Sequence, residues 1–259
     1  MASVEYIRVF VGWDSQEPIT YQVATHSILK RASGPVAIVP LRKPGLQRYA
    51  RPRASVEATE FSLTRFLVPY LSGYEGFSIF MDCDMLVNVD IWDVLLHPLA
   101  EPGKAVYCCQ HDYVPKQATK FEGHVQTTYP RKNWSSFMIF DNAKCKALTP
   151  DRVNELSGLD LHRFNWLEGD HQIGSLPLTW NWLVGEYEPN QNANVFHYTN
   201  GAPCFQGYED CDHSDLWWQE LDDMMEPVPS IGFRALMADR RRVIERHQRM
   251  LSKALLTAK

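Results

Sequence analysis

The segment FSIFMDCDMLVNVD (residues 77–90) places two carboxylates directly after an apolar run. Its first five residues, through Met81, predict a buried strand, and Asp82 and Asp84 follow one residue apart. Because side chains alternate along an extended chain, both carboxylates face the same side. Buried charge is costly unless it is paired or holds a metal ion. The segment therefore predicts either a solvated turn or a cation site at the end of a strand.

The chemistry of such a cation site follows from its ligands. Carboxylate oxygens favour Mg²⁺ or Mn²⁺, and these ions commonly bridge carboxylates to phosphates. In open α/β sheets the usual ligand site is the crevice beyond the carboxyl ends of the strands. His197, in VFHYTNGAPCF (residues 195–205), follows a short apolar run and is a candidate third ligand. A packed or surface histidine is the alternative interpretation.

The composition is typical of a globular protein. The chain has 259 residues, of which 45% are hydrophobic and 22% charged, and its net charge of −5 gives no general case for a nucleic-acid partner. The opening residues MASVEYIRVFVGWD lack a basic region followed by a long apolar core, so we expect no signal peptide. The six cysteines form no C-x-x-C pair and are expected to be reduced thiols, so we expect a cytoplasmic protein.

The order of the elements predicts an α/β protein. An apolar strand over residues 6–12, a helix over residues 17–32 with Pro18 in its first turn, and a strand over residues 35–41 form a βαβ unit, which argues for a parallel sheet. The remaining elements are expected as strands at residues 104–110 and 135–141 and as helices at residues 58–71, 149–158 and 168–176.

The last residues differ in charge from the rest of the chain. We expect one domain over residues 1–230, followed by a basic amphipathic helix over residues 231–259 with a local charge of about +6. Such a helix can dock on an anionic membrane surface. It can also pack on its own domain or form a contact in a homo-oligomer, and the sequence leaves these alternatives open.

Several segments together resemble the GT-A fold glycosyltransferases. The likeness is strongest to the retaining family 8, which includes glycogenin and bacterial lipopolysaccharide galactosyltransferases, and this chain is a divergent branch of that pattern. It implies a GT-A (Rossmann-like) nucleotide-diphospho-sugar transferase fold, with a mixed central sheet flanked by helices. The matching segments are the opening strand to Asp14, SLTRFLVPYL, FMDCDMLVNVDIWDVL, NWSSFMIFD, GDHQIGSLPLTWNW and HYTNGAPCF.

The resemblance assigns roles on the donor side. It implies that Asp82, Asp84 and His197 bind Mn²⁺ or Mg²⁺, which holds the diphosphate of a nucleotide-sugar such as a UDP-sugar. Val11 and Asp14 would lie along the base and the ribose. The remaining expected donor-binding residues are Cys83, Gly201 through its backbone N–H, and Arg65.

The resemblance also assigns catalytic roles. Arg65 corresponds to the family's arginine near the donor, because a guanidinium suits a phosphate or a sugar hydroxyl. A surface helix charge is the alternative. Asp170 corresponds to an acid that orients the donor sugar. His171 aligns with the family's glutamine beside the reacting carbon, and Gln172 is its neighbour.

Two departures from the family pattern affect the donor contacts. The family usually reads F-N-x-G where this chain has NWSS, so Asn133 is shifted by one residue and Trp134 takes the place of the amide. The closing motif of the family carries a lysine that contacts the phosphate, whereas this chain has Ala202 before Pro203.

The sequence therefore predicts a metal-dependent hexosyltransferase that uses a nucleotide-sugar, retains the anomeric configuration, and acts on a saccharide or lipid-linked acceptor. With a lipid-linked acceptor, the protein would lie peripherally on the inner face of the membrane. One alternative is a phosphatase of the haloacid dehalogenase type, although Leu86 stands where that pattern has Thr or Val. The other is a nucleotide-sugar-binding protein without turnover.

Overall fold

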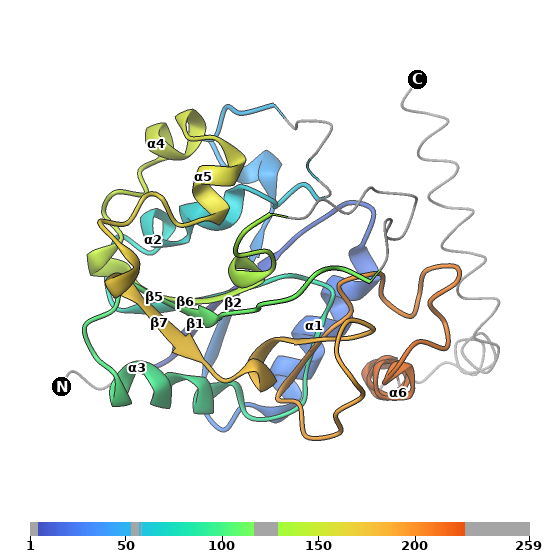
Figure 1. Cartoon of the computed structure of the whole chain (residues 1–259). Coiled ribbons are helices and arrows are strands. Elements are labelled where there is room, and N and C mark those ends of the chain that lie inside the picture. Colours follow the sequence, from blue (N-terminus) through green and yellow to red (C-terminus); the bar gives the residue numbers. More distant parts are fainter. Residues whose placement is uncertain (1–4, 53–56, 58, 117–128, 226–259) are drawn as a thin grey trace.

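The computed structural model describes residues 5–52, 57, 59–116 and 129–225, and its centre is a six-stranded sheet (Figure 1). The strand order is β2-β1-β3-β6-β5-β7. β6 runs antiparallel to both β3 and β5, whereas the other neighbouring pairs are parallel, so the sheet is mixed as predicted. The strands are β1 (Ile7–Gly12), β2 (Val36–Leu41), β3 (Phe77–Met81), β5 (Val106–Cys109), β6 (Phe137–Asp141) and β7 (Ile173–Leu176).

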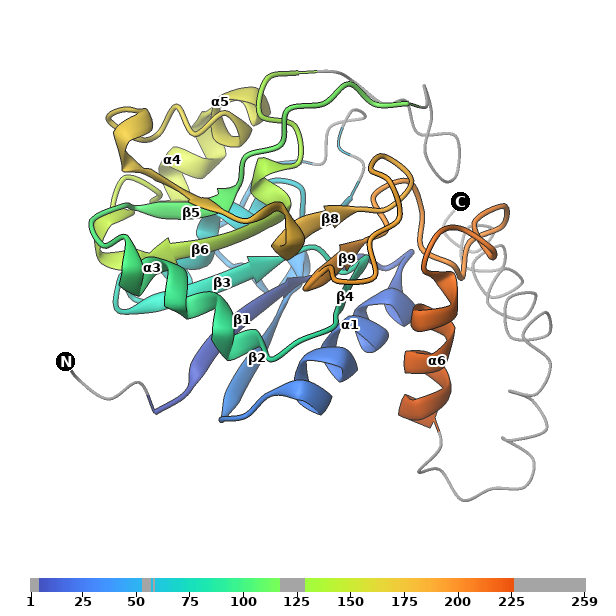
Figure 2. The ribbon, with the colours of Figure 1, turned by 60° about the horizontal axis from the view of Figure 1, so that its bottom comes forward.

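A second, three-stranded sheet lies just beyond the carboxyl end of β3 (Figure 2). Its strand order is β4-β9-β8, with β4 antiparallel and β8 parallel to β9. The register pairs Met85 with His197, so the chain that leaves β3 runs directly into the neighbour of His197. The strands are β4 (Met85–Val87), β8 (Trp182–Leu183) and β9 (Val195–His197).

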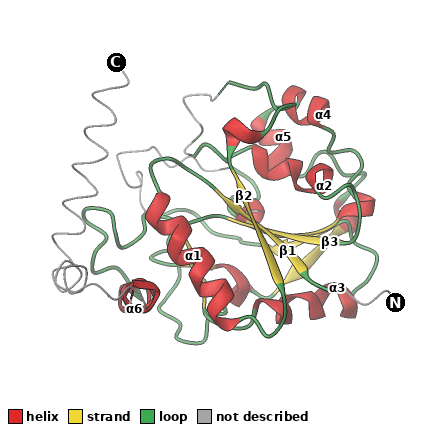
Figure 3. Cartoon of the chain, turned by 180° about the vertical axis from the view of Figure 1, so that it is seen from behind, coloured by secondary structure: helices red, strands yellow, loops and turns green. Residues whose placement is uncertain are grey.

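Helices cover both faces of the main sheet (Figure 3). α2, α4 and α5 lie on one face, α1 and α3 lie on the other, and α6 packs outside α1. Among the described residues, no helix has the length and apolar character needed to cross a bilayer. The helices are α1 (Pro18–Arg31), α2 (Val68–Leu71), α3 (Leu96–Ala100), α4 (Pro150–Glu155), α5 (Gly158–His162) and α6 (Ser214–Met225).

An ionic cluster joins α1 to α6. The carboxylate of Glu220 on α6 is buried, and it accepts from His26 Nδ1 at 2.5 Å and from Arg31 Nη1 at 2.8 Å. Lys30 of the same last turn of α1 contacts Asp223. The charges of Lys30 and Arg31 also suit the carboxyl end of a helix, where the backbone dipole is negative. The cluster fixes α6, the last described element, against the first βαβ unit.

The described part of the predicted helix at residues 58–71, residues 59–71, differs from a long helix. It forms turns, then a 3₁₀ helix (Thr64–Leu67) and the single turn of α2. Local side-chain bonds compete with the helical ladder, since Ser62 Oγ donates to the Thr59 carbonyl at 2.9 Å. The Glu60 N–H donates to Asp14 Oδ2 at 2.8 Å instead of capping a helix. Tertiary contacts with the end of β1 thus override the apolar periodicity.

The prediction of a helix at residues 168–176 is wrong. The structure has one 3₁₀ turn (Asp170–Gln172) followed by β7, which pairs in parallel with β5. The Ala105 N–H donates to the Gln172 carbonyl at 2.8 Å, which starts the pairing. Gly174 then faces the ring of Tyr107 so closely that only a glycine fits.

The other predicted elements are confirmed within one to a few residues at each end. β1, α1 and β2 form the expected βαβ unit, and β3, β5 and β6 are strands. α4 begins as predicted, with the Thr149 hydroxyl accepting from the Arg152 N–H at 3.1 Å. The predicted basic helix at residues 231–259 lies outside the described residues, so the two-part division of the chain stays a prediction.

We expect Gly174→Ala to lower the free energy of unfolding by about 1–3 kcal/mol, because overpacking forces neighbours to move. The added Cβ would lie 2.2 Å from Cδ1 of Tyr107. That ring is buried, and its hydroxyl donates to the Glu101 carbonyl at 2.7 Å, so it cannot turn away freely. Urea unfolding followed by tryptophan fluorescence measures the change.

Gly45→Ala is the matched control, since a Cβ there meets no atom within 4 Å. It should not destabilise the protein. An unchanged unfolding midpoint for Gly174→Ala would contradict the close packing of β7 on Tyr107.

Candidate functional site

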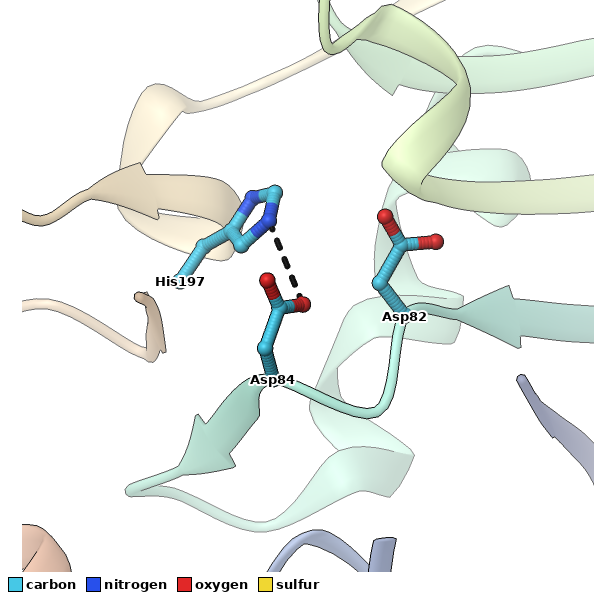
Figure 4. Close-up of side chains that lie close together, drawn as sticks. All are labelled: Asp82, Asp84 and His197. Carbon is cyan, nitrogen blue, oxygen red and sulfur yellow. Dashed lines mark ion pairs between the residues drawn. The ribbon is translucent and has the colours of Figure 1, made fainter. Parts of the chain in front are cut away.

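The carboxyl end of β3 places the two aspartates at the edge of the main sheet. The Asp82 N–H donates to the Ser136 carbonyl at 3.0 Å, which extends the β3–β6 ladder one residue beyond the strand. The Tyr198 N–H donates to the Asp84 carbonyl at 2.9 Å, and this bond connects Asp84 to the small sheet. Both side chains are partly exposed and face the same space, as the alternation predicts (Figure 4).

His197 completes a three-residue cluster with these aspartates. It ends β9, and its Nε2 lies 3.4 Å from Asp84 Oδ1. One ligand atom from each of Asp82, Asp84 and His197 lies within 4.8 Å of the others. Two carboxylate oxygens and one imidazole nitrogen suit a divalent cation such as Mn²⁺ or Mg²⁺. The donor set therefore fits the metal that the sequence predicts.

Arg65 lies inside this site and is not a surface charge. It is 5% exposed, and its Nη1 lies 2.9 Å from Asp82 Oδ1 and 2.8 Å from the Ser135 carbonyl. Its guanidinium also stacks over the ring of Phe80, with 4.9 Å from Cζ to the ring centroid. The 3₁₀ helix that carries Arg65 thus holds a cation against the first aspartate. Its predicted role near the donor stays a prediction.

A buried asparagine, which sequence reasoning missed, contacts the outer nitrogen of the histidine. Asn181 Oδ1 lies 2.8 Å from His197 Nδ1, and Asn181 is fully buried. It sits at the end of the 3₁₀ turn after β7, one residue before β8. The only sequence signal was its place in LTWNW, which carries no marker of a metal site.

A buried acid beneath the cluster was also missed. Glu17 is 2% exposed, and its Oε2 lies 3.5 Å from Cys83 Sγ. Burial, followed by the negative charges of Asp84, Asp14 and Asp82, raises the pKa of Glu17 well above its usual value. Burial next to three aspartates therefore favours the protonated form of Glu17. Its position before Pro18 gave no signal beyond that of a helix start.

The predicted base and ribose residues pack into the floor of the site. Val11 is fully buried in β1, in register with Met81. Asp14 is buried, and its two carboxylate oxygens accept from the N–H groups of Gln16 at 2.9 Å and of Glu60 at 2.8 Å. These bonds fix the loop after β1 against the turn at residues 59–63. Contacts of Val11 and Asp14 with a nucleoside stay a prediction.

Cys83 and Gly201 are likewise framework positions in this structure. Burial raises the pKa of the Cys83 thiol well above its usual value, so the thiol is neutral. The Gly201 N–H, which was predicted to meet a phosphate, donates to the Tyr198 carbonyl at 2.9 Å. Gly201 has φ of +154°, and a Cβ there would lie 2.7 Å from the ring of Tyr208. The glycine is thus required by the turn itself.

The structure does not bring Asp170, His171 and Gln172 to the metal cluster. They precede β7, whose first residue pairs with Val106 at the edge where β3 begins. The two edges are separated by the five residues of β3, or about 15 Å.

Each of the three residues is engaged in local contacts. Asp170 has a 79% exposed side chain and pairs with Arg131 at 2.6 Å. The His171 carbonyl accepts from Lys104 Nζ at 3.0 Å, and Gln172 Oε1 accepts from the Glu168 N–H at 2.9 Å.

Aromatic rings and a buried histidine form a wall next to the cluster. His111, just after β5, lies close enough to His197 for the two charges to interact, and its Nδ1 lies 2.8 Å from the Tyr187 hydroxyl. Burial, followed by the charge of His197, lowers the pKa of His111 to about 3. Tyr113 packs against both rings, with centroids 6.3 Å and 6.1 Å away. His111 is therefore a neutral member of this wall.

The opposite side of the cluster is positively charged. His162 Nδ1 lies 2.7 Å from Ser135 Oγ, and the Ser135 carbonyl accepts from Arg65. Burial, followed by the charges of Arg65 and Lys132, lowers the pKa of His162 to about 3. The site is thus flanked by cations on the Arg65 side and by neutral rings on the His111 side.

Comparison with known proteins places the chain in a family. No family model matches it. Protein CDI of Arabidopsis thaliana is 47% identical over 228 residues, which cover 83% of this chain and 86% of that protein. The chain belongs to the Protein CDI family. The name of that relative states no activity.

Solved glycosyltransferase structures have the same fold. The WbbM bifunctional glycosyltransferase has a TM-score of 0.59 at 16% identity, covering 85% of this chain and half of that one. The galactosyltransferase LgtC, in complex with donor and acceptor sugar analogs, has a TM-score of 0.54 at 11% identity, covering 88% and 99%. GlyE of Streptococcus pneumoniae TIGR4 has a TM-score of 0.54 at 11% identity, covering 83% and 60%. The chain therefore has the GT-A fold, as the sequence predicts.

We expect the buried acid to make stability depend on pH. Because the pKa of Glu17 is raised in the folded protein, its contribution to stability is complete below about pH 4.5 and is lost as pH rises toward the folded pKa. Glu17→Gln removes this loss. Relative to the wild type, the metal-free variant should therefore gain stability from pH 5 to pH 8, by at most about 1.4 kcal/mol per pH unit.

Urea unfolding in EDTA at several pH values measures this difference. Glu188→Gln, at an exposed glutamate, is the matched control for the loss of one carboxylate. A stability difference for Glu17→Gln that does not change with pH would contradict a protonated Glu17.

Proposed function

We propose that this protein is a metal-dependent glycosyltransferase that moves a hexose from a nucleotide-sugar to an acceptor hydroxyl. The observation that carries the proposal is the cluster of Asp82, Asp84 and His197 at the carboxyl edge of a GT-A sheet. In open α/β sheets this edge is where ligands bind. Two acids and an imidazole in that place are a ligand set for a divalent cation that also holds phosphate oxygens.

In this proposal the metal ligands and Arg65 have different roles. Asp82, Asp84 and His197 would hold the metal ion, which would supply positive charge to the leaving diphosphate. Arg65 holds Asp82 in place through its 2.9 Å contact and adds positive charge beside the leaving group. Partial burial makes each of these charges more effective than it would be in water.

The finer substrate features follow from the family 8 resemblance. We infer a UDP-hexose donor, a saccharide or lipid-linked acceptor, and a product that retains the anomeric configuration. Catalytic roles for Asp170, His171 and Gln172 stay predictions, since β7 pairs with β5 directly after them and they are not part of the metal cluster. Peripheral membrane contact through residues 231–259 and homo-oligomerisation stay predictions.

The contacts of Asp82 favour transfer over the phosphatase alternative. In the phosphatase the first aspartate is the nucleophile, whereas here Asp82 is paired with Arg65 beside the cluster. A binding protein without turnover would share the same cluster, so activity decides between binding and transfer.

The decisive assay follows release of UDP from a panel of UDP-hexoses with Mn²⁺, with and without candidate glycan and lipid-linked acceptors. We expect activity to be lost in EDTA, and Asp84→Asn or His197→Ala to lower the turnover number at least about 100-fold. Because both act through one ion, the double variant should lose little more than either single one. NMR of the product should show an α-linked hexose.

Asp151→Asn, at a surface aspartate that contacts Arg48, is the control and should keep full activity. Full activity of Asp84→Asn, or of the wild type in EDTA, would contradict a catalytic metal ion at Asp82, Asp84 and His197. Tight binding of UDP-sugars with neither transfer nor hydrolysis would instead support the binding protein.

We expect Arg65→Lys to lower kcat/KM for the donor by about tenfold or more. A lysine has a single ammonium group, and it cannot keep the planar guanidinium that spans Asp82 and the Ser135 carbonyl and stacks on Phe80. Steady-state kinetics with varied donor measures the effect. Arg48→Lys, at an exposed arginine, is the matched control. Unchanged donor kinetics in Arg65→Lys would show that Arg65 only supports the fold.

A further inference from the structure

The hydrogen bonds around Asn181 have only one consistent set of directions. Its Nδ2 lies 3.1 Å from the Asn133 carbonyl, which can only accept, and 2.8 Å from Ser136 Oγ. The Ser136 hydroxyl donates its own hydrogen to the Asn133 carbonyl at 2.7 Å, so it accepts from Asn181. Both amide hydrogens of Asn181 are therefore used. The atom that faces His197 is the amide oxygen.

This orientation determines which nitrogen of His197 carries the hydrogen. Asn181 Oδ1 lies 2.8 Å from His197 Nδ1, and an amide oxygen can only accept. Nδ1 must then be the N–H, and when the ring binds a metal ion its lone pair is on Nε2. Nε2 lies 3.4 Å from Asp84 Oδ1. A metal ion between these two atoms would bind both the lone pair and the carboxylate oxygen.

We propose that Asn181 is a positioning residue that fixes His197 in the Nδ1–H form and so directs the Nε2 lone pair to a divalent cation between the aspartates. The inference rests on the metal site of the proposed function and names the residue that orients its nitrogen ligand. Partners of this kind set both the tautomer and the angle of a ligating histidine.

Asn181 also joins the two parts of the site. The turn at residues 133–136 accepts its amide hydrogens, and the carbonyls of the same turn accept from Asp82 N–H at 3.0 Å and from Arg65 Nη1 at 2.8 Å. His197 belongs to the small sheet, whereas this turn leads into β6 of the main sheet. The buried amide of Asn181 thus fixes the position of the His197 ring relative to Asp82.

Asn142 provides a matched control. It is fully buried, and its Nδ2 also donates to a serine hydroxyl, Ser78 Oγ at 2.9 Å, and to a backbone carbonyl, that of Glu75 at 3.0 Å. It lies at the opposite edge of the sheet, where β6 ends. Replacing either asparagine with leucine removes two Nδ2 hydrogen bonds of the same kind, one to a serine hydroxyl and one to a backbone carbonyl. Only the change at Asn181 also removes a bond to a histidine.

The test measures Mn²⁺ affinity of metal-stripped, full-length protein by isothermal titration calorimetry, without donor or acceptor. We expect Asn181→Leu to weaken Mn²⁺ binding about 10- to 100-fold. Asn181→Asp keeps an oxygen acceptor for Nδ1–H and should stay within about threefold of the wild type. Asn142→Leu should leave the affinity unchanged, while both leucine variants lower the unfolding midpoint. The ¹⁴N coupling of bound Mn²⁺, read by electron spin echo, should persist in Asn181→Asp and disappear in Asn181→Leu.

The outcomes separate the two proposals. If the wild type does not bind Mn²⁺, the metal part of the proposed function fails and this inference fails with it. If the wild type binds and Asn181→Leu binds equally well, only the positioning role is overturned. Equal losses in Asn142→Leu and Asn181→Leu, or in Asn181→Asp and Asn181→Leu, also overturn it. Asn181→Ala replaces the leucine variant if the latter does not fold.

Discussion

Two carboxylates that lie one residue apart at the end of a buried strand impose the main constraint on this structure. Like charges so close together, in a place with little water, raise the free energy of the fold unless positive charge or hydrogen donors compensate them. Arg65 meets Asp82. In the proposed site a divalent cation between Asp84 and the Nε2 of His197 would compensate the second carboxylate. Burial, followed by the nearby aspartates, raises the pKa of Glu17 beneath them, so a further negative charge there is disfavoured.

The antiparallel strand β6 makes this compensation possible. Its position between β3 and β5 brings the turn at residues 133–136 to the carboxyl end of β3. A parallel strand there would begin at the other edge and would bring its own carboxyl end to the site. The carbonyls of this turn then receive the Asp82 N–H and the Arg65 side chain. The antiparallel direction of β6 is thus what places hydrogen-bond acceptors for Asp82 and Arg65 at the cluster.

Local patterns were sufficient to predict the parts of the site that lie on regular elements. The strand before Asp82 and the β1–α1–β2 unit follow from periodicity, and the proximity of His197 to Asp84 follows from the family resemblance. Arg65 was predicted at the site, although the helix expected around it is mostly turns. A residue can thus be placed correctly even when its backbone conformation is not.

The errors and omissions depend on contacts between distant residues. Residues 168–176 have helical apolar spacing, but pairing with β5 and the close approach of Gly174 to Tyr107 make them a turn and a strand. Asp170 thus stands on a turn before β7, where it pairs with Arg131. Asn181 and Glu17 could not be recognised, because their importance comes from burial beside His197 and the aspartates.

The NWSS turn, where the chain departs from the family pattern, is well ordered by hydrogen bonds next to the Asp82, Asp84 and His197 cluster. The shifted Asn133 has φ of +63°, and its Nδ2 donates to the Tyr113 hydroxyl at 2.8 Å while its carbonyl accepts from Asn181. Trp134 Nε1 donates to the His111 carbonyl at 2.8 Å, so the NWSS turn is fixed on both sides.

Ala202, at the place of the family's phosphate-contacting lysine, is fully buried, and a lysine there would have to bury its charge. In the proposed function, positive charge beside the leaving group would therefore come from another part of the chain. Arg65 contacts Asp82 and can supply that charge next to the metal cluster. Because the family pattern also has an arginine at this position, the proposal needs no new cation to replace the lysine.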